Sequence, residues 1–156
     1  MERKIRMTID EFWKEFLSVS NRGGSTEYYE AFYFGMTEKQ ANELLALVLE
    51  GTKTATSGSL ACYQAEGGRP PAPGDLSIVT DWNGKPRCVI ETVAVTILPF
   101  KDMSFELCRR EGEDLTLKTW QEAHRKFFTA ALSEIGGKFT EEMLVVFEDF
   151  KVVYAK

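Results

Sequence analysis

The stretch TEKQANELLALVLEGTKTAT (residues 37–56) predicts a helix that runs into a polar loop ahead of a strand. Thr37 and Gln40 have the spacing of a capping box, in which the first side chain accepts a hydrogen bond from the first turn of the helix. Apolar residues then recur at steps of three and four, and Gly51 takes the place of a C′ glycine. Gly51-Thr52-Lys53-Thr54-Ala55-Thr56 follows, with side chains that a loop leaves accessible.

Helices and strands are predicted on both sides of this stretch. Thr8-Ile9-Asp10-Glu11 is a second capping box and predicts a helix over about Ile9 to Val19, and an apolar stripe predicts a long helix from Leu117 to Ile135. A short helical turn is expected near Asp102 to Arg110. Strands are predicted over Ser59–Gln64, Leu76–Asp81, Arg87–Leu98 and Met143–Tyr154. The third of these is rich in Val, Ile and Thr, and the last is dense in Val and Phe. Asn83-Gly84 predicts a type I′ hairpin turn.

The bulk composition is that of one intracellular domain. The chain has 156 residues and a net charge of −5, and its three cysteines have no metal-binding or redox spacing. One domain over residues 1–156 is expected, with an N-terminal helical extension at about 1–33. Because no positive field attracts long nucleic acids and no window spans a bilayer, we expect a cytoplasmic protein without DNA or membrane partners. No oligomeric state is predicted.

Lys53 has three interpretations on the residues alone. It is a solvated lysine in a threonine-rich connection, a cation that binds an anion, or a base that activates a neighbouring hydroxyl. Composition favours the first. Thr56 is the neighbouring hydroxyl, and its cooperation with Lys53 requires a bend, which Gly51 and Gly58 permit.

Gly51, Lys53 and Thr56 match the G-x-K-x-x-T core of the ASCH domain family, and the chain from Phe34 to Tyr154 resembles the branch of predicted RNA-binding ASCH proteins. The resemblance includes Phe34-Gly35, Pro73-Gly74-Asp75, Pro99-Phe100, Glu111-Gly112-Glu113 and the helix with Trp120, His124 and Phe127-Phe128. It implies an α+β, PUA-like fold, a small curved β-barrel with flanking helices. It also implies a cleft, lined by the Gly51–Thr56 loop, that binds RNA or a nucleoside.

The resemblance to an amidohydrolase of this family implies hydrolysis of N4-acetylcytidine. Lys53 would be the base, Thr56 the nucleophile and Glu113 the proton relay, with Glu111 as the alternative carboxylate. Backbone N–H groups of the loop would stabilise the oxyanion. The residues expected to bind substrate are Gly51, Thr54, Ser57, Tyr33, His124 and Glu111. The histidine lies on an apolar stripe, so a structural role competes with this one.

Two other functions compete with the amidohydrolase. In a non-catalytic RNA-binding module, Lys53 contacts a phosphate. In a single-strand ribonuclease, a divalent metal would need Glu91, Glu111 and Glu113 to converge; the other two functions need no metal or cofactor. Many ASCH proteins carry a basic residue where this chain has Gly58, and the lack of that cation favours a small nucleoside pocket over a track for long RNA.

Overall fold

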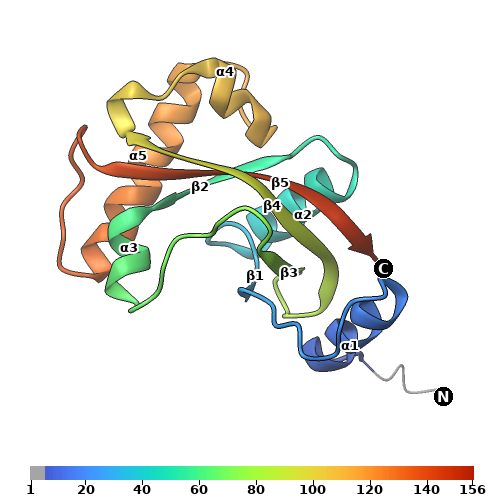
Figure 1. Ribbon diagram of the computed structural model, residues 1–156. Coiled ribbons are helices and arrows are strands. Elements are labelled where there is room, and N and C mark those ends of the chain that lie inside the picture. The colour runs from blue at the N-terminus through green and yellow to red at the C-terminus, as the bar shows by residue number, and fades with distance from the viewer. Residues whose placement is uncertain (1–5) are drawn as a thin grey trace. The chain divides into compact units, whose positions relative to one another are not determined.

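A computed structural model describes residues 6–156 and has an α+β fold, as predicted (Figure 1). The elements are α1 (Ile9–Val19), β1 (Ala31–Phe32), α2 (Glu38–Leu49), β2 (Ala55–Ser59), α3 (Leu60–Ala65), β3 (Leu76–Thr80), β4 (Pro86–Pro99), η1 (Phe100–Asp102), α4 (Phe105–Cys108), η2 (Arg109–Glu111), α5 (Leu117–Glu134) and β5 (Leu144–Ala155).

The five strands form one mixed sheet in the order β1-β3-β4-β5-β2. β1 runs parallel to β3, whereas β3 pairs with β4 and β2 with β5 in the antiparallel sense. The sheet therefore has two edge strands, β1 and β2, and the expected curved barrel takes the form of an open sheet.

Two compact units divide the chain, and each is assembled from separate segments. Of the described residues, 6–51, 74–91 and 151–156 make the first unit, and residues 52–73 and 92–150 make the second. Both β4 and β5 pass from one unit to the other. A single domain with an N-terminal extension stays a prediction, and residues 1–5 of that extension lie outside the described part of the chain.

In the first unit, α1 packs its apolar face on the sheet. Thr8 is the predicted N-cap, since its hydroxyl accepts a hydrogen bond from the Glu11 amide at 3.1 Å. The Glu11 carboxylate accepts from the Thr8 hydroxyl at 3.0 Å, in place of the backbone amide that a complete capping box would use. The buried cluster under this helix contains Phe12, Trp13, Phe16, Leu17, Leu76, Ile78 and Val89. Each such side chain contributes about 1.5–3 kcal/mol through removal of its apolar surface from water.

The hairpin between β3 and β4 differs from the prediction. A type I′ turn needs positive φ at both central residues, but Gly84 is at φ 81° and Asn83 is not in that region. The Gly84 amide donates to the Asp81 carbonyl and the Asp81 amide to the Lys85 carbonyl, both at 3.0 Å. The connection is thus three residues long, a type I turn followed by a left-handed glycine. Two amides donating to Asp81 Oδ1 at 2.9 Å stabilise this longer form.

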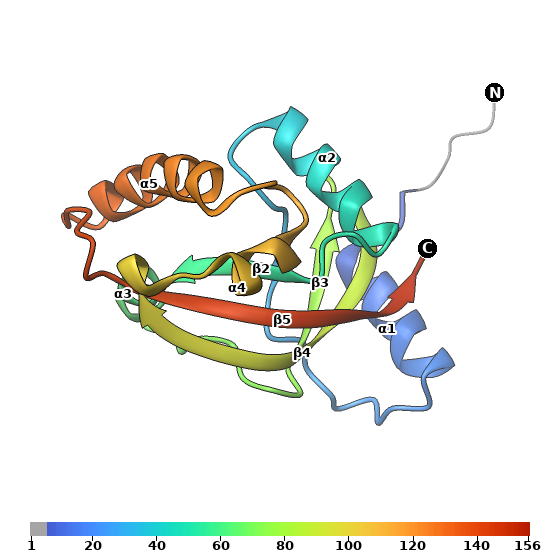
Figure 2. The same cartoon turned by 90° about the horizontal axis from the view of Figure 1, so that it is seen from above.

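In the second unit, α5 packs against β2 and β5, and its side chains share one core with them (Figure 2). Trp120, Phe128 and Leu132 of α5 are buried there with Phe100 and Phe147. The strand predicted over Ser59–Gln64 is wrong. Its first residue ends β2 and caps α3 instead, because the Ser59 hydroxyl accepts a hydrogen bond from the Cys62 amide.

The cysteines Cys62, Cys88 and Cys108 are all free thiols. Burial raises the pKa of Cys88 to about 12 and that of Cys108 to about 11. Within residues 6–156, no helix is both long and apolar enough to cross a membrane.

Candidate functional site

The candidate site begins where α2 stops and the chain turns into β2. Gly51, at φ 85°, is the C′ residue that the sequence predicts, and its amide donates to the Val48 carbonyl at 3.1 Å. Thr54 then attaches this loop to η2. Its amide and its hydroxyl both donate to the Arg110 carbonyl, at 2.9 and 3.3 Å. The loop that carries Lys53 is therefore held against the segment that carries Glu111.

Gly112 permits the close approach of these two segments. Its φ is 73°, in the left-handed region, and a Cβ at this position would lie 2.5 Å from the Thr52 carbonyl oxygen. No side chain fits at that distance. A glycine is thus required between Glu111 and Glu113 for both carboxylates to reach the Lys53 loop.

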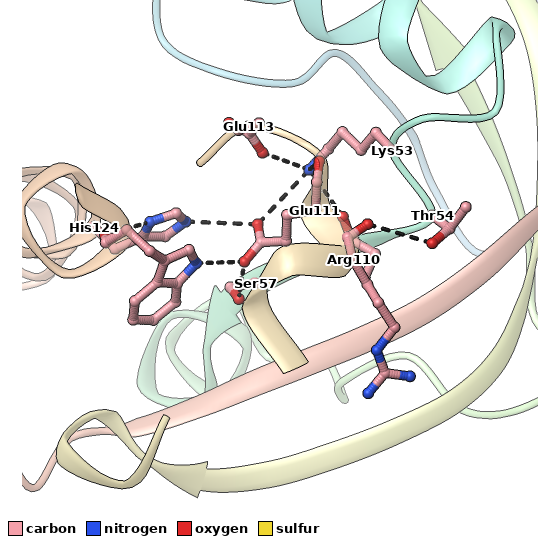
Figure 3. A network of polar contacts seen from close by, with 9 residues as sticks. Lys53, Thr54, Ser57, Arg110, Glu111, Glu113 and His124 are labelled. Carbon is pink, nitrogen blue, oxygen red and sulfur yellow. Dashed lines mark hydrogen bonds and ion pairs between the residues drawn. The ribbon is translucent and has the colours of Figure 1, made fainter. Parts of the chain in front are cut away.

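Lys53 is the central residue of the site, with only 1% of its side chain exposed. Its ammonium donates to Glu113 Oε2 at 2.6 Å and to the Ala55 carbonyl at 2.8 Å, and it lies 3.6 Å from Glu111 Oε1 (Figure 3). A buried ammonium is costly unless it is paired and hydrogen-bonded, and both conditions are met here. The interpretation of Lys53 as a solvated lysine is therefore wrong.

Glu111 is a buried carboxylate that receives several donors. Trp120 Nε1–H donates to Oε2 at 2.5 Å and the Ser57 hydroxyl donates to the same oxygen at 2.9 Å, while Oε1 faces Lys53 and His124, each at 3.6 Å. Burial raises the pKa of this carboxyl. The hydrogen bond and charge of His124 and the charge of Lys53 outweigh burial, so the pKa stays below its ordinary value.

His124 stacks on Trp120 one helical turn before it, with ring centroids 4.2 Å apart and planes within 16°. Its Nδ1 is 2.9 Å from the Trp120 carbonyl oxygen and its Nε2 faces Glu111. Burial lowers the pKa of the imidazole, but the hydrogen bond and charge of Glu111 exceed that effect and raise the pKa above its ordinary value. The single histidine is therefore more than a core residue, since its Nε2 lies 3.6 Å from the Glu111 carboxylate.

Most of the predicted site residues meet in this network. Glu111 contacts Lys53, Ser57 and His124, and Lys53 also contacts Glu113, although Lys53 and Glu111 are 58 positions apart in the chain. The sequence allows either Glu111 or Glu113 as the carboxylate beside the lysine, and both contact it. The roles assigned to these residues stay predictions.

Thr56 has a different position from Ser57. Successive side chains of a strand point to opposite faces, so Thr56 of β2 faces away from the side on which Ser57 meets Glu111. The Lys53 ammonium nevertheless lies beside the Thr56 peptide, because it donates to the Ala55 carbonyl, which is bonded directly to the Thr56 nitrogen.

Tyr33 belongs to the first unit, where its ring lies 4.9 Å from that of Trp82. It is 42% exposed, as a base-stacking residue needs to be, but its role as a substrate-binding residue stays a prediction. Gly51 is also in the first unit.

The sequence does not assign to the site three residues that support it, which are Trp120, Arg110 and Gly112. Trp120 has the spacing of a core residue and is one, with no exposed surface, but its indole N–H also fixes Glu111. Arg110 acts through its backbone carbonyl, which no residue type reveals. Only Gly112 carries a signal, as the glycine between two glutamates.

A cavity of about 340 Å³ in the second unit does not coincide with this network. Lys138 is the one charged residue in its lining, which is otherwise mostly apolar and includes Leu60, Leu132, Ile135 and Leu144. This lining has no carboxylate to pair with its lysine, whereas Lys53 contacts two carboxylates, so the reactive centre is better placed at Lys53. Among the described residues, no group of three or more His, Cys, Asp and Glu side chains is arranged to hold a metal.

An α+β chain with an open mixed sheet and a buried lysine–carboxylate network before β2 has the architecture of a PUA-like domain with a polar site. The ASCH domain model matches residues 30–154, and the chain belongs to that family. It is similar to an ASCH domain from Lactobacillus crispatus JV V101 at 38% identity, with 93% of each chain covered and a TM-score of 0.83. The predicted family and its PUA-like fold are confirmed.

A second similar structure is protein EF3133 from Enterococcus faecalis V583, at 32% identity and a TM-score of 0.87, covering 94% of this chain and 88% of that one. The hypothetical protein PH0355 shares the fold alone, at 19% identity and a TM-score of 0.51, with 80% of this chain and 97% of that chain covered. No curated protein matches this chain.

Proposed function

We propose that this protein binds an N4-acylated cytidine, as a nucleoside or as a base of RNA, and hydrolyses its acyl amide. The observation that carries the proposal is the contact of 2.6 Å between Lys53 Nζ and Glu113 Oε2. Only 1% of the lysine side chain is exposed, whereas 26% of the glutamate side chain is. A buried amine thus donates a hydrogen bond to a carboxylate that reaches the surface, which is the arrangement that a base and its relay require.

The contact prepares both catalytic groups in one step. Transfer of a proton from Lys53 to Glu113 leaves a neutral amine and a carboxylic acid. Because the Thr56 side chain lies on the face of β2 opposite to Ser57, the next step requires that substrate binding bring Thr56 Oγ1 within hydrogen-bond reach of Lys53 Nζ. The amine then takes the Thr56 hydroxyl proton as Oγ1 attacks the acyl carbonyl carbon. When the C–N4 bond breaks, Glu113 gives its proton to the N4 nitrogen and cytidine leaves, with the acyl group on Thr56 and Lys53 again an ammonium.

Water completes the cycle. Glu113 takes one proton of the water while the resulting hydroxide attacks the ester carbon. The C–Oγ1 bond breaks and Thr56 receives a proton from Lys53, which Glu113 then reprotonates. The products are cytidine and a carboxylic acid, and each residue regains its starting state.

Burial of Lys53 favours this chemistry over a phosphate contact. A phosphate-binding lysine presents its ammonium to solvent, but this one is enclosed and already compensated by two carboxylates. A phosphate would also meet the negative charge of Glu111 and Glu113. The net charge of −5 adds to the preference for a single base over a long RNA track.

The test is release of cytidine and acetate from N4-acetylcytidine by the purified protein. Lys53→Ala, Glu113→Gln and Thr56→Ala are each expected to lower the rate about 10²–10⁴-fold, the usual contribution of positioned acid–base groups. Lys126→Ala and Glu122→Gln are matched controls on exposed positions of α5, and their rates are expected to equal that of the unmodified protein.

Labelled single-stranded RNA, incubated with and without a chelator, separates the rival functions. Binding of the RNA without turnover of any acylated cytidine indicates a non-catalytic module. Shortened RNA that disappears with the chelator indicates a ribonuclease. Either result, or full activity in Lys53→Ala, overturns the proposal.

A further inference from the structure

We propose that His124 is a protonated positioning residue that, together with Lys53, holds Glu111 as a permanent counter-ion and leaves Glu113 alone to exchange protons with Lys53. The first part stands on geometry alone. The second part rests on the proposed function.

The two ring nitrogens of His124 require the charged form. Nδ1 lies 2.9 Å from the Trp120 carbonyl oxygen, which only accepts hydrogen bonds, so Nδ1 carries a proton. In the neutral ring Nε2 would then present a lone pair to Glu111 Oε1, 3.6 Å away. A carboxylate and a lone pair repel each other, whereas a second N–H attracts the carboxylate. Both nitrogens are therefore protonated when Glu111 is ionised.

Glu111 is held by partners on both of its carboxylate oxygens, whereas Glu113 is partly exposed to solvent. The Trp120 indole and the Ser57 hydroxyl both donate to one oxygen, and two cations face the other. Every partner is a donor or a cation, so protonation of this carboxylate would place a proton against them. Glu113, by contrast, is partly exposed and bonds Lys53 directly.

The charges within the network balance only if His124 is protonated. Lys53 and His124 then supply two positive charges against those of Glu111 and Glu113. Loss of the histidine proton would leave one uncompensated negative charge beside the lysine, favour the ammonium and hold back the free amine that attack requires. His124 thus acts through Glu111 and Lys53.

The charged groups nearest to His124 come from three segments of the chain. Glu111 comes from η2, Glu113 from the loop after it and Lys53 from the loop before β2. On α5 itself, Arg125 pairs with Glu141, and Glu122 and Lys126 are exposed.

The experiment is an NMR titration of the imidazole, which is unambiguous because the chain contains one histidine. In the unmodified protein, the ¹⁵N shifts at pH 6.5 are expected to show both nitrogens protonated, and the midpoint is expected above the ordinary 6.5. Glu111→Gln is expected to lower the midpoint by about 1–3 pH units, the effect of removing an adjacent opposite charge. Glu122→Gln is the matched control and leaves the midpoint unchanged.

A neutral ring at pH 6.5 in the unmodified protein overturns the proposal without any variant, so failure of Glu111→Gln to fold leaves the test intact. For the second part, His124→Phe keeps the aromatic stack and removes the charge. It is expected to lower kcat for N4-acetylcytidine about tenfold or more with KM unchanged; unchanged kcat refutes that part. If the titration succeeds and no turnover is seen, the proposed function fails and the charged histidine stands.

Discussion

Replacing the buried Glu111 with glutamine tests the network most directly, because the change keeps the shape and removes only the charge. The carboxylate receives Trp120 and Ser57 on one oxygen and faces Lys53 and His124 with the other. A glutamine amide has one oxygen and one NH₂ group, so in either orientation the NH₂ group meets donors.

The expected cost follows from these contacts. A hydrogen bond to a charged group contributes about 1.5–3 kcal/mol, and removal of one partner from a buried ion pair costs about 3–5 kcal/mol. We expect Glu111→Gln to lower the free energy of unfolding by about 3–5 kcal/mol. For a chain of this size, the lower end of that range corresponds to a fall in Tm of about 6–12 °C.

The cost also depends on pH, with a sign set by the two pKa shifts. The lowered pKa of Glu111 means that its stabilisation is present above the ordinary value of 4.5 and is lost as pH falls through the lower folded value. The raised pKa of His124 means that its stabilisation is complete below 6.5 and is lost as pH rises through the higher folded value. The difference between variant and unmodified protein is therefore largest between about pH 4.5 and 6.5.

The assay is urea unfolding followed by circular dichroism at several pH values, with Glu122→Gln as the control. That exposed substitution on α5 is expected to change the unfolding free energy by less than about 0.5 kcal/mol. A cost below about 1 kcal/mol for Glu111→Gln, or a cost that does not vary with pH, would refute the reasoning that the carboxylate is ionised and fully paired.

Two further predictions concern backbone and thiols. Gly112→Ala combines a left-handed backbone with overlap on the Thr52 carbonyl and is expected to lower the free energy of unfolding by about 2–5 kcal/mol. The control Gly136→Ala, at φ 75° with open space around it, carries only the backbone strain of about 1–2 kcal/mol. Equal losses for the two variants in thermal unfolding would contradict the close approach of Gly112 to Thr52. Iodoacetamide at pH 8 is expected to modify only the partly exposed Cys62 in the native protein and all three cysteines in urea. Mass spectrometry that shows rapid labelling of the buried Cys88 and Cys108 in the native protein would be inconsistent with the raised pKa of these thiols.

Local signals in the sequence predict the helices well. The bounds of α1 agree with the prediction, the Gly51 stop lies where a glycine in the left-handed region ends α2, and α5 ends within one residue of the predicted Ile135. Such features depend on hydrogen bonds within a few residues, so composition and spacing suffice to find them.

The errors arise where two local signals compete. Ser59 to Gln64 has the residues of a strand, but the Ser59 side chain caps the following turn, so the segment forms α3. Asn83-Gly84 is typical of a tight hairpin, but the Asp81 carboxylate binds two amides and favours a longer loop. A short polar side chain that binds the backbone decided both cases.

The sequence by itself determined the ASCH family, the position of the polar loop and the identity of the lysine and carboxylates. Only the tertiary structure decided that Lys53 is enclosed, that both Glu111 and Glu113 contact it, and that Trp120 and His124 complete the network. The physical reason is distance along the chain. A buried charge is stable only beside partners, and here the partners come from segments more than 50 positions away, brought together by Gly112 and the Arg110 carbonyl.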